Sequence, residues 1–253
     1  QAARSALSSG KILAVKGLGG FHLVCDAQNP QALEELRARK RRSGKPFALM
    51  AFNLKVIQKF ARVSPEEQKL LTSTVSPIVL LELTPQGKEL AKLVAPDQNR
   101  LGFMLPYTPL HLLLLEPAPN FPEVLVMTSG NLSEEPIAFT NEDARQRLSN
   151  LADGFLLHDR PIHMRVDDSV VSIIDGTPHL QRRARGYAPL PVQLPVSAIP
   201  SLACGTELKN TFCLARERYA FVSHHIGDLE NQETLTAFEA AISHYERIFR
   251  IQP

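Results

Sequence analysis

The sequence predicts an α/β protein with a mixed sheet, followed by the start of a second α/β domain. Three observations lead to this prediction. Apolar segments of strand length alternate with helix-length segments from residue 1 to 183. A stretch with four prolines then covers 187–200. Beyond it, a new strand and helix pattern begins and runs to residue 253.

The first elements follow from apolar periodicity and helix end signals. A helix at 1–9 is ended by Gly10, and a strand at 11–16 follows. The strand runs into the glycine-rich segment GLGGFHL (17–23). An amphipathic helix at 30–40 comes next, and a run of basic residues begins in its last turn.

A strand at 47–52 and two short helices within 54–71 are predicted next. The second of these helices begins with Ser64 as its N-cap. Pro65 occupies its first position, and Glu67 is the expected capping-box partner.

Further strands are predicted at 77–83 and 123–127. Between them, 102–116 predicts a strand, a proline-rich corner and a helix. A charged helix at 141–150 follows, and short strands occupy 154–183. Strands that alternate with helices in this way favour a sheet with mixed strand directions.

The proline density of 187–200 predicts that no regular element forms there. We therefore predict a domain at 1–190, a linker at 191–200 and an incomplete second domain at 201–253. The second domain should hold a hairpin at 211–223 and a helix at 230–250. One face of that helix is apolar: Leu235, Phe238, Ile242, Tyr245 and Phe249.

The two ends of the sequence favour a part of a longer protein, since it begins without Met and stops soon after a helical pattern. The second domain would then have a thin core, and its apolar helix face few partners. We expect it to be the least stable part of the chain.

Composition limits the class of protein. The chain has 253 residues, of which 44% are hydrophobic and 21% charged, and no apolar run approaches a membrane span. There is no signal peptide pattern. The three cysteines, Cys25, Cys204 and Cys213, are odd in number and widely spaced, which fits neither a disulfide framework nor a zinc site. A reducing, cytoplasmic location is expected.

Positive charge is concentrated in two places. The segment 37–45 holds six basic residues and no acid, and 180–186 holds three more. The 19 basic residues elsewhere are outnumbered by 26 acidic ones. A local basic patch on an otherwise acidic chain implies a local anion, such as a polyphosphate or a nucleic acid.

The first candidate site is the Lys-x-Arg pair Lys40 and Arg42, followed by Lys45. A solvated helix end explains such cations equally well, because they stabilise a helix C-terminus. However, an ammonium beside a planar guanidinium suits a triphosphate. In that case we expect Lys40 and Arg42 on a solvated cleft.

The second candidate is the glycine-rich segment. It lacks the P-loop pattern and the full dinucleotide fingerprint, so a tight turn is the simpler interpretation. Its glycines would nevertheless let backbone approach a ligand closely. The candidate residues are Lys16, Gly17, Gly19, Gly20, Phe21 and His22.

The third candidate is TSGNLSEEPI (128–137), which follows an apolar strand. A helix N-cap or an Asx-turn would explain one Ser or Asn. It does not explain Ser129, Asn131 and Ser133 at alternating positions. This pattern suggests donors aimed at a ligand.

Other chemistry finds no support in the sequence. We see no supported Ser/His/Asp triad, no paired-carboxylate signature and no HExxH motif. Asp167 and Asp168 could help to hold magnesium, but a loop pair is the simpler interpretation. No residue is predicted as a protein-bound metal ligand.

These motifs together resemble the YrdC family over roughly residues 5–190. The shared features are Lys-x-Arg, Lys-Pro at 45–46, Ser-x-Asn-x-Ser after a buried strand, DDSVV at 167–171 and Arg-Gly at 185–186. Longer blocks resemble the HypF family of carbamoyltransferases. These blocks are VKGLGGFHL, LRARKRRSGKPFALM, MLPYTPLH, MTSGNLSEEPI, HDRPIHMRVDDSVV, RRARGYAP and GTELKNTFCLA…SHHIGDLEN.

The resemblance implies a twisted mixed sheet with a concave nucleotide cleft, ATP and Mg²⁺ as cofactors, and formation of carbamoyl-adenylate from carbamate. Carbamate would come from carbamoyl phosphate, and the carbamoyl group would pass to the C-terminal cysteine of a HypE-type partner. Lys40, Arg42 and Arg185 would be catalytic, although Arg182 and Arg183 lie close to Arg185 in the sequence. The nucleotide or carbamoyl-adenylate would contact the glycine-rich set above together with Lys45, Ser129, Asn131 and Ser133.

The resemblance also implies that the residues present here suffice for adenylation at most, because the family's acylphosphatase domain and metal-binding histidines have no counterpart among them. His224 and His225 belong to an earlier segment than those histidines.

Two other functions remain open. Other YrdC proteins make threonylcarbamoyl-adenylate for tRNA modification, but they have no reason to continue into GTELKNTF and SHHIGDLEN. A non-catalytic RNA-binding module could also use a basic concave face. RNA is the weaker expectation because the basic patch has no interleaved aromatic residues and the chain has no Trp. No membrane partner is expected.

Overall fold

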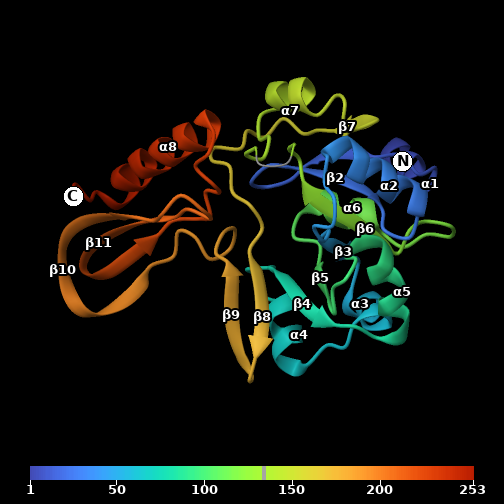
Figure 1. The fold of residues 1–253 in the computed structure, drawn as a ribbon, viewed down its shortest axis with the longest axis horizontal. Coiled ribbons are helices and arrows are strands. Elements are labelled where there is room, and N and C mark those ends of the chain that lie inside the picture. The colour runs from blue at the N-terminus through green and yellow to red at the C-terminus, as the bar shows by residue number, and fades with distance from the viewer. Residues whose placement is uncertain (133–134) are drawn as a thin grey trace.

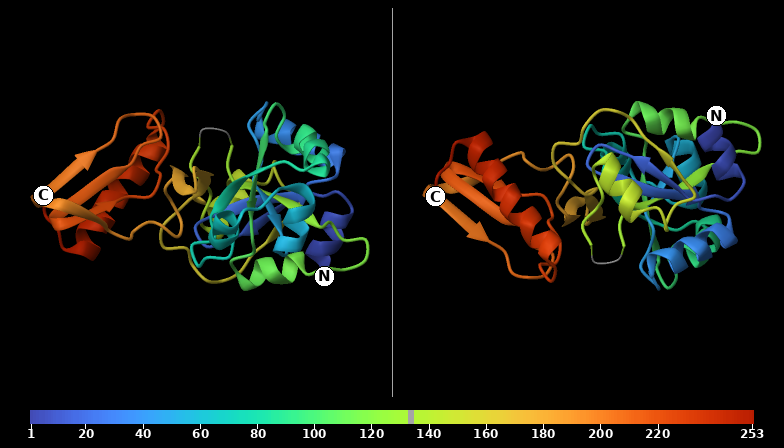
Figure 2. Two further views of the ribbon diagram at one scale, coloured as in Figure 1. Left: turned by 90° about the horizontal axis from the view of Figure 1, so that it is seen from below. Right: turned by 90° about the horizontal axis from the view of Figure 1, so that it is seen from above.

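The computed structural model describes residues 1–132 and 135–253. It shows a mixed α/β protein with two lobes (Figure 1). The larger lobe is built on a nine-stranded sheet, and the smaller one pairs two long strands with the C-terminal helix. The two lobes lie side by side in both further views (Figure 2). The predicted fold class is confirmed.

The nine strands follow the order β7-β1-β2-β6-β3-β5-β4-β8-β9. Three neighbouring pairs are parallel, namely β1–β7, β3–β5 and β4–β8, and the other neighbours are antiparallel. The sheet is therefore mixed, as predicted. The strands are β1 (Leu13–Lys16), β2 (Phe21–Asp26), β3 (Leu49–Ala51), β4 (Ile78–Glu82), β5 (Arg100–Met104), β6 (Val124–Ser129), β7 (Gly154–Leu156), β8 (Val170–Ile174) and β9 (Thr177–Arg182).

Helices cover both faces of this sheet (Figure 1). They are α1 (Ala2–Ser8), α2 (Pro30–Lys40), α3 (Leu54–Phe60), α4 (Pro65–Leu71), α5 (Pro85–Val94), α6 (Pro109–Leu115) and α7 (Asn141–Arg147). The predicted capping box of α4 is confirmed, since Ser64 accepts from the Glu67 amide and the Glu67 side chain accepts from the Ser64 amide.

Strand alternation divides the core into two layers. In β1, Ala14 packs with one layer and Leu13 and Val15 with the other. The first layer includes buried residues of α2, α3 and α5, and the second includes residues of α1 and α6. No helix of the described residues is long and apolar enough to cross a membrane.

Two elements were not predicted. Strand β2 occupies part of the glycine-rich segment, and five of its six residues are buried. A strand buried on both faces shows no alternation of polar and apolar residues. Helix α5 contains Gly87, which lowers helix propensity. The sequence nevertheless holds an N-terminal helix signal, since Thr84 caps the helix by accepting from the Gly87 amide.

The prediction that no regular element forms in 187–200 was wrong. Strand β10 (Val192–Cys204) pairs antiparallel with β11 (Phe212–Val222). The register shifts between Gln193 and Ala198 and again between Ala198 and Ser201, so the prolines at 195 and 200 fall where regular pairing is interrupted. Residues 211–223 form one strand of this pair rather than a separate hairpin. The boundaries at 190 and 200 stay predictions.

Helix α8 (Gln232–Phe249) packs on β11, and this gives its apolar face more cover than predicted. Tyr245 is only 2% exposed, and its ring lies 5.0 Å from that of Phe212. The rings of Phe221 and Phe249 stack at 3.8 Å. Leu235, at 37% exposure, is the member of the face that remains open to solvent.

Candidate nucleotide site

Lys40 ends helix α2, and its side chain reaches the loop after β6. Asn29 caps the start of this helix, and Arg41, in the left-handed conformation, ends it. The Lys40 ammonium lies 2.7 Å from the Ser129 carbonyl, 2.6 Å from the Asn131 carbonyl and 3.0 Å from Asn131 Oδ1. Lys40 is only 1% exposed, so its expected place on a solvated cleft was wrong.

Burial changes the acidity of Lys40. Burial and, second, the nearby Arg42 guanidinium lower the pKa of Lys40 to about 7, although Glu135 opposes this effect. A low-dielectric site disfavours the charged ammonium, whereas an incoming anion would favour it. The charge of Lys40 is therefore sensitive to what enters the site.

The loop after β6 forms a platform around Lys40. Ser129 Oγ donates to Asn131 Oδ1 over 2.8 Å, and Asn131 Nδ2 donates to the Glu135 carbonyl over 2.5 Å. Gly130 fits because a Cβ there would lie 2.8 Å from the Phe21 side chain and carbonyl. The polar groups of the loop thus position Lys40. Ser133, also predicted here, lies outside the described residues.

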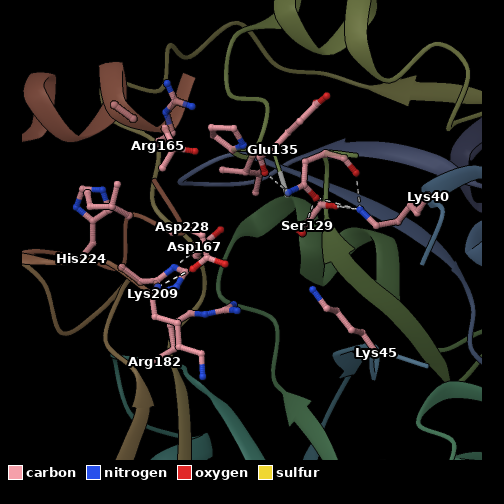
Figure 3. Close-up of a pocket in the computed structure, with 18 of the residues that line it drawn as sticks. Lys40, Lys45, Ser129, Glu135, Arg165, Asp167, Arg182, Lys209, His224 and Asp228 are labelled. Carbon is pink, nitrogen blue, oxygen red and sulfur yellow. Dashed lines mark hydrogen bonds and ion pairs between the residues drawn. The ribbon is translucent and has the colours of Figure 1, made fainter. Parts of the chain in front are cut away.

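A cavity of about 280 Å³ opens beside this platform (Figure 3). In Figure 3, Lys40 and Lys45 stand on one side, Arg165 and His224 on the other, and Asp167 and Arg182 between them. Among the residues that the structure describes, cationic side chains outnumber acidic ones in its lining. The cationic ones are Lys40, Arg42, Lys45, Arg165, Arg182 and Lys209, and the acidic ones are Glu135, Asp167 and Asp228.

The predicted cations Arg42 and Lys45 lie at this wall. Arg42 donates to the Pro46 carbonyl over 2.7 Å and to the Lys45 carbonyl over 3.3 Å. Its guanidinium also lies 5.4 Å from the Phe47 ring centre. The structure therefore brings Lys40, Arg42, Lys45, Ser129 and Asn131 together in the lining of one cavity, and their role in binding a nucleotide stays a prediction.

Arg185 is placed differently from the prediction, since it does not belong to the lining of this cavity. It donates through Nε to Asp168 over 2.8 Å and through its terminal nitrogens to the carbonyls of Val75 and Ser76. Its guanidinium stacks 3.5 Å from the Tyr107 ring centre. The cavity is lined instead by Arg182, which lies at the end of β9.

Asp168 is the centre of this second, buried network. Burial opposes its ionisation, but hydrogen bonds from His22 and Arg185 and their charges hold the pKa of Asp168 well below its usual range. His22 Nε2 lies 2.8 Å from Asp168 Oδ2, and the Tyr107 hydroxyl donates to Oδ1 over 3.1 Å. Asp168 therefore links β2, the corner at Tyr107 and the segment that follows β9.

His111 shares this region, with its ring 4.6 Å from that of Tyr107. Burial and, second, the neighbouring His22 lower the pKa of His111 to about 3, although Asp168 opposes this effect.

The glycine-rich segment serves packing in this structure. Gly17 N–H donates to the Gly20 carbonyl over 2.8 Å, which closes a tight turn. A Cβ on Gly19 would lie 2.1 Å from the Val166 carbonyl, and one on Gly20 would lie 2.6 Å from Ile137. These glycines allow close approach to the chain itself rather than to the cavity, from whose lining they are absent.

The flanking residues are also used internally. Lys16 is buried, and its ammonium donates to the His158 carbonyl over 3.1 Å. Phe21 is fully buried in the core. His22 is bound to Asp168, as described above. None of the three lines the cavity among the described residues.

Several residues of the smaller lobe line the cavity and were not predicted as site residues. They are Lys209, His224, His225, Ile226, Gly227, Asp228, Thr234 and Ala237. His225 Nδ1 lies 3.2 Å from Asp167 Oδ2, so the two lobes meet at the cavity. The signal in the sequence was the polar block SHHIGDLEN, but nothing in it indicates which distant residues it faces.

The described side chains that line the cavity do not form a set of ligands for a metal ion held by the protein alone. Within residues 1–132 and 135–253, no group of three or more His, Cys, Asp or Glu side chains could hold a metal. Asp167 is half-buried and already bound to His225. Burial opposes its ionisation, but the hydrogen bond to His225 together with the charges of Arg182 and His225 lowers the pKa of Asp167. Such single carboxylates fit only a cation held mainly by a nucleotide's phosphates, as Mg²⁺ often is.

The larger lobe is a Sua5/YrdC-type domain. The family model for Sua5, YciO and YrdC proteins, described as telomere recombination, matches residues 5–184. A second model, described as the HypF Kae1-like domain, matches residues 197–253.

Comparison with individual proteins identifies the family of the chain more closely. Carbamoyltransferase HypF of Synechocystis sp. is 48% identical over 98% of this chain and 32% of its own length. The crystal structure of a full-length HypF in the phosphate- and nucleotide-bound form has a TM-score of 0.93 and 46% identity, over all of this chain and 39% of that one. The chain belongs to the HypF family of carbamoyltransferases and spans about a third of the length of these curated relatives.

A more distant relative is threonylcarbamoyl-AMP synthase of Photobacterium profundum. It is 29% identical over 57% of this chain and 78% of its own length.

Proposed function

We propose that the cationic cavity binds the phosphates of ATP and that ATP then reacts there with carbamate to give carbamoyl-adenylate. The observation that carries this proposal is the convergence of Lys40, Arg42, Lys45 and Arg182 on one cavity wall. Guanidinium and ammonium groups are the side chains best suited to phosphate oxygens.

The chemistry requires little from the protein beyond binding and charge. A carbamate oxygen attacks the α-phosphorus, the bond from that phosphorus to the bridging oxygen breaks, and pyrophosphate leaves with the electron pair. Carbamate is already an anion, so no side chain has to remove a proton. The barrier lies in bringing anions together and in stabilising charge on the phosphoryl oxygens.

Lys40 is the best placed group for that stabilisation. It is held by three oxygens of the β6 loop, so its position is fixed before the substrates arrive. Asn131 and Ser129 act as positioning residues, since they hold Lys40 and each other. Mg²⁺ bound with ATP would neutralise phosphate charge, and Asp167 is the carboxylate on the wall between the two lobes that could assist in holding it.

The proposal for the carbamoyl transfer that follows adenylation depends on family membership. HypF relatives carry the name carbamoyltransferase, and this chain covers about a third of their length. We propose that carbamate derives from carbamoyl phosphate and that the carbamoyl group passes to a cysteine of a HypE-type partner. Hydrogenase maturation would be the process served.

A second candidate is the synthesis of threonylcarbamoyl-adenylate, which the match to threonylcarbamoyl-AMP synthase favours. It would use the same phosphate-binding cations. The match of 197–253 to the HypF Kae1-like domain favours carbamoyl transfer instead. Adding threonine to the reaction separates the two, because only the second candidate depends on it.

The role of Asn131 is testable by kinetics. Asn131→Ala should lower the rate of pyrophosphate release more than it lowers ATP affinity, because it misplaces Lys40 without removing its charge. Pyrophosphate release and calorimetric titration with ATP·Mg²⁺ measure the two effects. Arg218 is an exposed arginine on β11, and Arg218→Ala serves as the control variant. Equal losses in rate and affinity would show that Asn131 is a simple binding group.

A further inference from the structure

A second cavity of about 420 Å³ lies between helix α8 and the segment before β8. Basic and histidine side chains dominate its polar lining. The full lining is Phe139, His163, Met164, Arg165, His224, Thr236, Ala237, Ala240, Ala241, Ser243, His244 and Arg247. No acidic side chain belongs to this lining among the residues that the structure describes.

The histidine and arginine side chains of this cavity lie close together. The rings of His163 and His244 are 5.0 Å apart, and Arg247 Nη2 lies 3.1 Å from His244 Nδ1. A guanidinium can only donate, so Nδ1 accepts and the neutral His244 ring carries its proton on Nε2. Burial, followed by the charges of His163 and Arg247, lowers the pKa of His244.

Among the described residues, no acidic side chain forms an ion pair with the arginines of this cluster. Asp143, Asp167 and Glu233 are near enough to influence Arg165, but none forms an ion pair with Arg165 or Arg247 within the described ranges. The histidines do not form a metal site either, since no metal-binding group of three occurs among the same residues.

The floor of the cavity consists of small side chains of α8. Ala237, Ala240 and Ala241 leave the space that a larger residue would fill. Arg165, His224 and Ala237 also line the first cavity, so the two cavities adjoin.

We infer that the second cavity is an anion site for phosphate-class oxyanions, either inorganic phosphate or pyrophosphate. The donors of Arg165, Arg247 and the two histidines would bind its oxygens. The inference depends only on the geometry of this cavity. It therefore holds or fails separately from the proposed carbamate adenylation.

Imidazole NMR of the ¹⁵N-histidine-labelled chain tests this inference directly. Among the eight histidines, the signals of His163 and His244 are assigned with His163→Gln and His244→Gln. Phosphate and pyrophosphate are titrated separately, and sodium chloride at equal ionic strength serves as the control. We expect saturable shifts of both signals with at least one oxyanion and none with chloride. The oxyanion that binds more tightly, phosphate or pyrophosphate, is the ligand assigned to the cavity.

Two variants distinguish a built site from general surface charge. Arg247→Ala should weaken the oxyanion affinity at least about fivefold. Ala240→Leu should do so without any change of charge, because it fills the floor. Arg218→Ala, which removes an exposed charge elsewhere, should leave the affinity within about twofold.

Three results would overturn the inference. They are equal shifts with chloride, no effect of Arg247→Ala or Ala240→Leu, and loss of the shifts in Arg182→Ala. The last result would assign the binding to the first cavity.

Discussion

Lys40 combines near-complete burial with a place on the wall of a cationic cavity. With a pKa of about 7, it is half neutral near pH 7 in the free protein. Bound ATP favours the ammonium, so above pH 7 binding must take up a proton. ATP affinity should therefore fall as pH rises above 7, by up to about tenfold per pH unit.

Calorimetric titration with ATP·Mg²⁺ between pH 6.5 and about 9 measures this dependence. Lys40→Met should bind ATP more weakly and lose the pH dependence. The variant should also be less stable, because the carbonyls of Ser129 and Asn131 lose their donor. An unchanged pH profile in Lys40→Met would show that another group titrates.

Arg182→Ala and Arg185→Ala form a matched pair of variants that compares a cavity arginine with a buried structural one. Arg182→Ala removes a half-buried cation from the cavity, so ATP affinity should fall about tenfold with little change in stability. Arg185→Ala leaves the buried Asp168 carboxylate without its arginine partner. It should lower the free energy of unfolding by about 3 kcal/mol.

Urea unfolding and ATP titration of both variants decide this assignment. A large affinity loss in a fully stable Arg185→Ala would restore Arg185 as the phosphate ligand. The sequence could not separate these arginines, because the choice depends on which one Asp168 and the 75–76 carbonyls bind.

At the scale of elements, helix α2 and strand β6 were predictable because their signals are local. The sequence could therefore single out Lys40 and the Ser129–Asn131 loop, which the structure places in the lining of one cavity. Strand β2 was missed because it is buried on both faces, and β10 because its prolines fall at register shifts. The side of the cavity formed by Lys209 and His224 could not be found, since it depends on contacts between distant segments.

Close packing against Phe60 explains why helix α5 contains Gly87. A Cβ at this position would lie 1.8 Å from the Phe60 carbonyl. Gly87→Ala should therefore destabilise the protein by about 2 kcal/mol, although the same change usually stabilises a helix by about 1 kcal/mol. Gly44→Ala is the control, because no atom lies within 4 Å of its added Cβ. Thermal unfolding compares them, and a stabilised Gly87→Ala would contradict this packing.

At the scale of the whole molecule, the two lobes differ in how much core they hold. The smaller lobe buries Phe212, Leu214, Ala241, Tyr245 and Ile251, whereas each layer of the large sheet buries many more residues. Amide protons of β10, β11 and α8 should therefore exchange faster than those of β2 and β6. Hydrogen exchange measured by segment checks this, and equal protection of α8 and β6 in a monomer would contradict it.

The cavity formed where the two lobes meet is proposed to make carbamoyl-adenylate, and its product can be observed directly. The chain is mixed with ATP, Mg²⁺ and carbamate, and the small molecules are analysed by mass spectrometry. We predict carbamoyl-AMP and an equal amount of pyrophosphate, without any need for threonine and with much less of both in Asn131→Ala. Formation of an acyl-adenylate only when threonine is added, or of no adenylate at all in a chain that binds ATP, would contradict the proposed function.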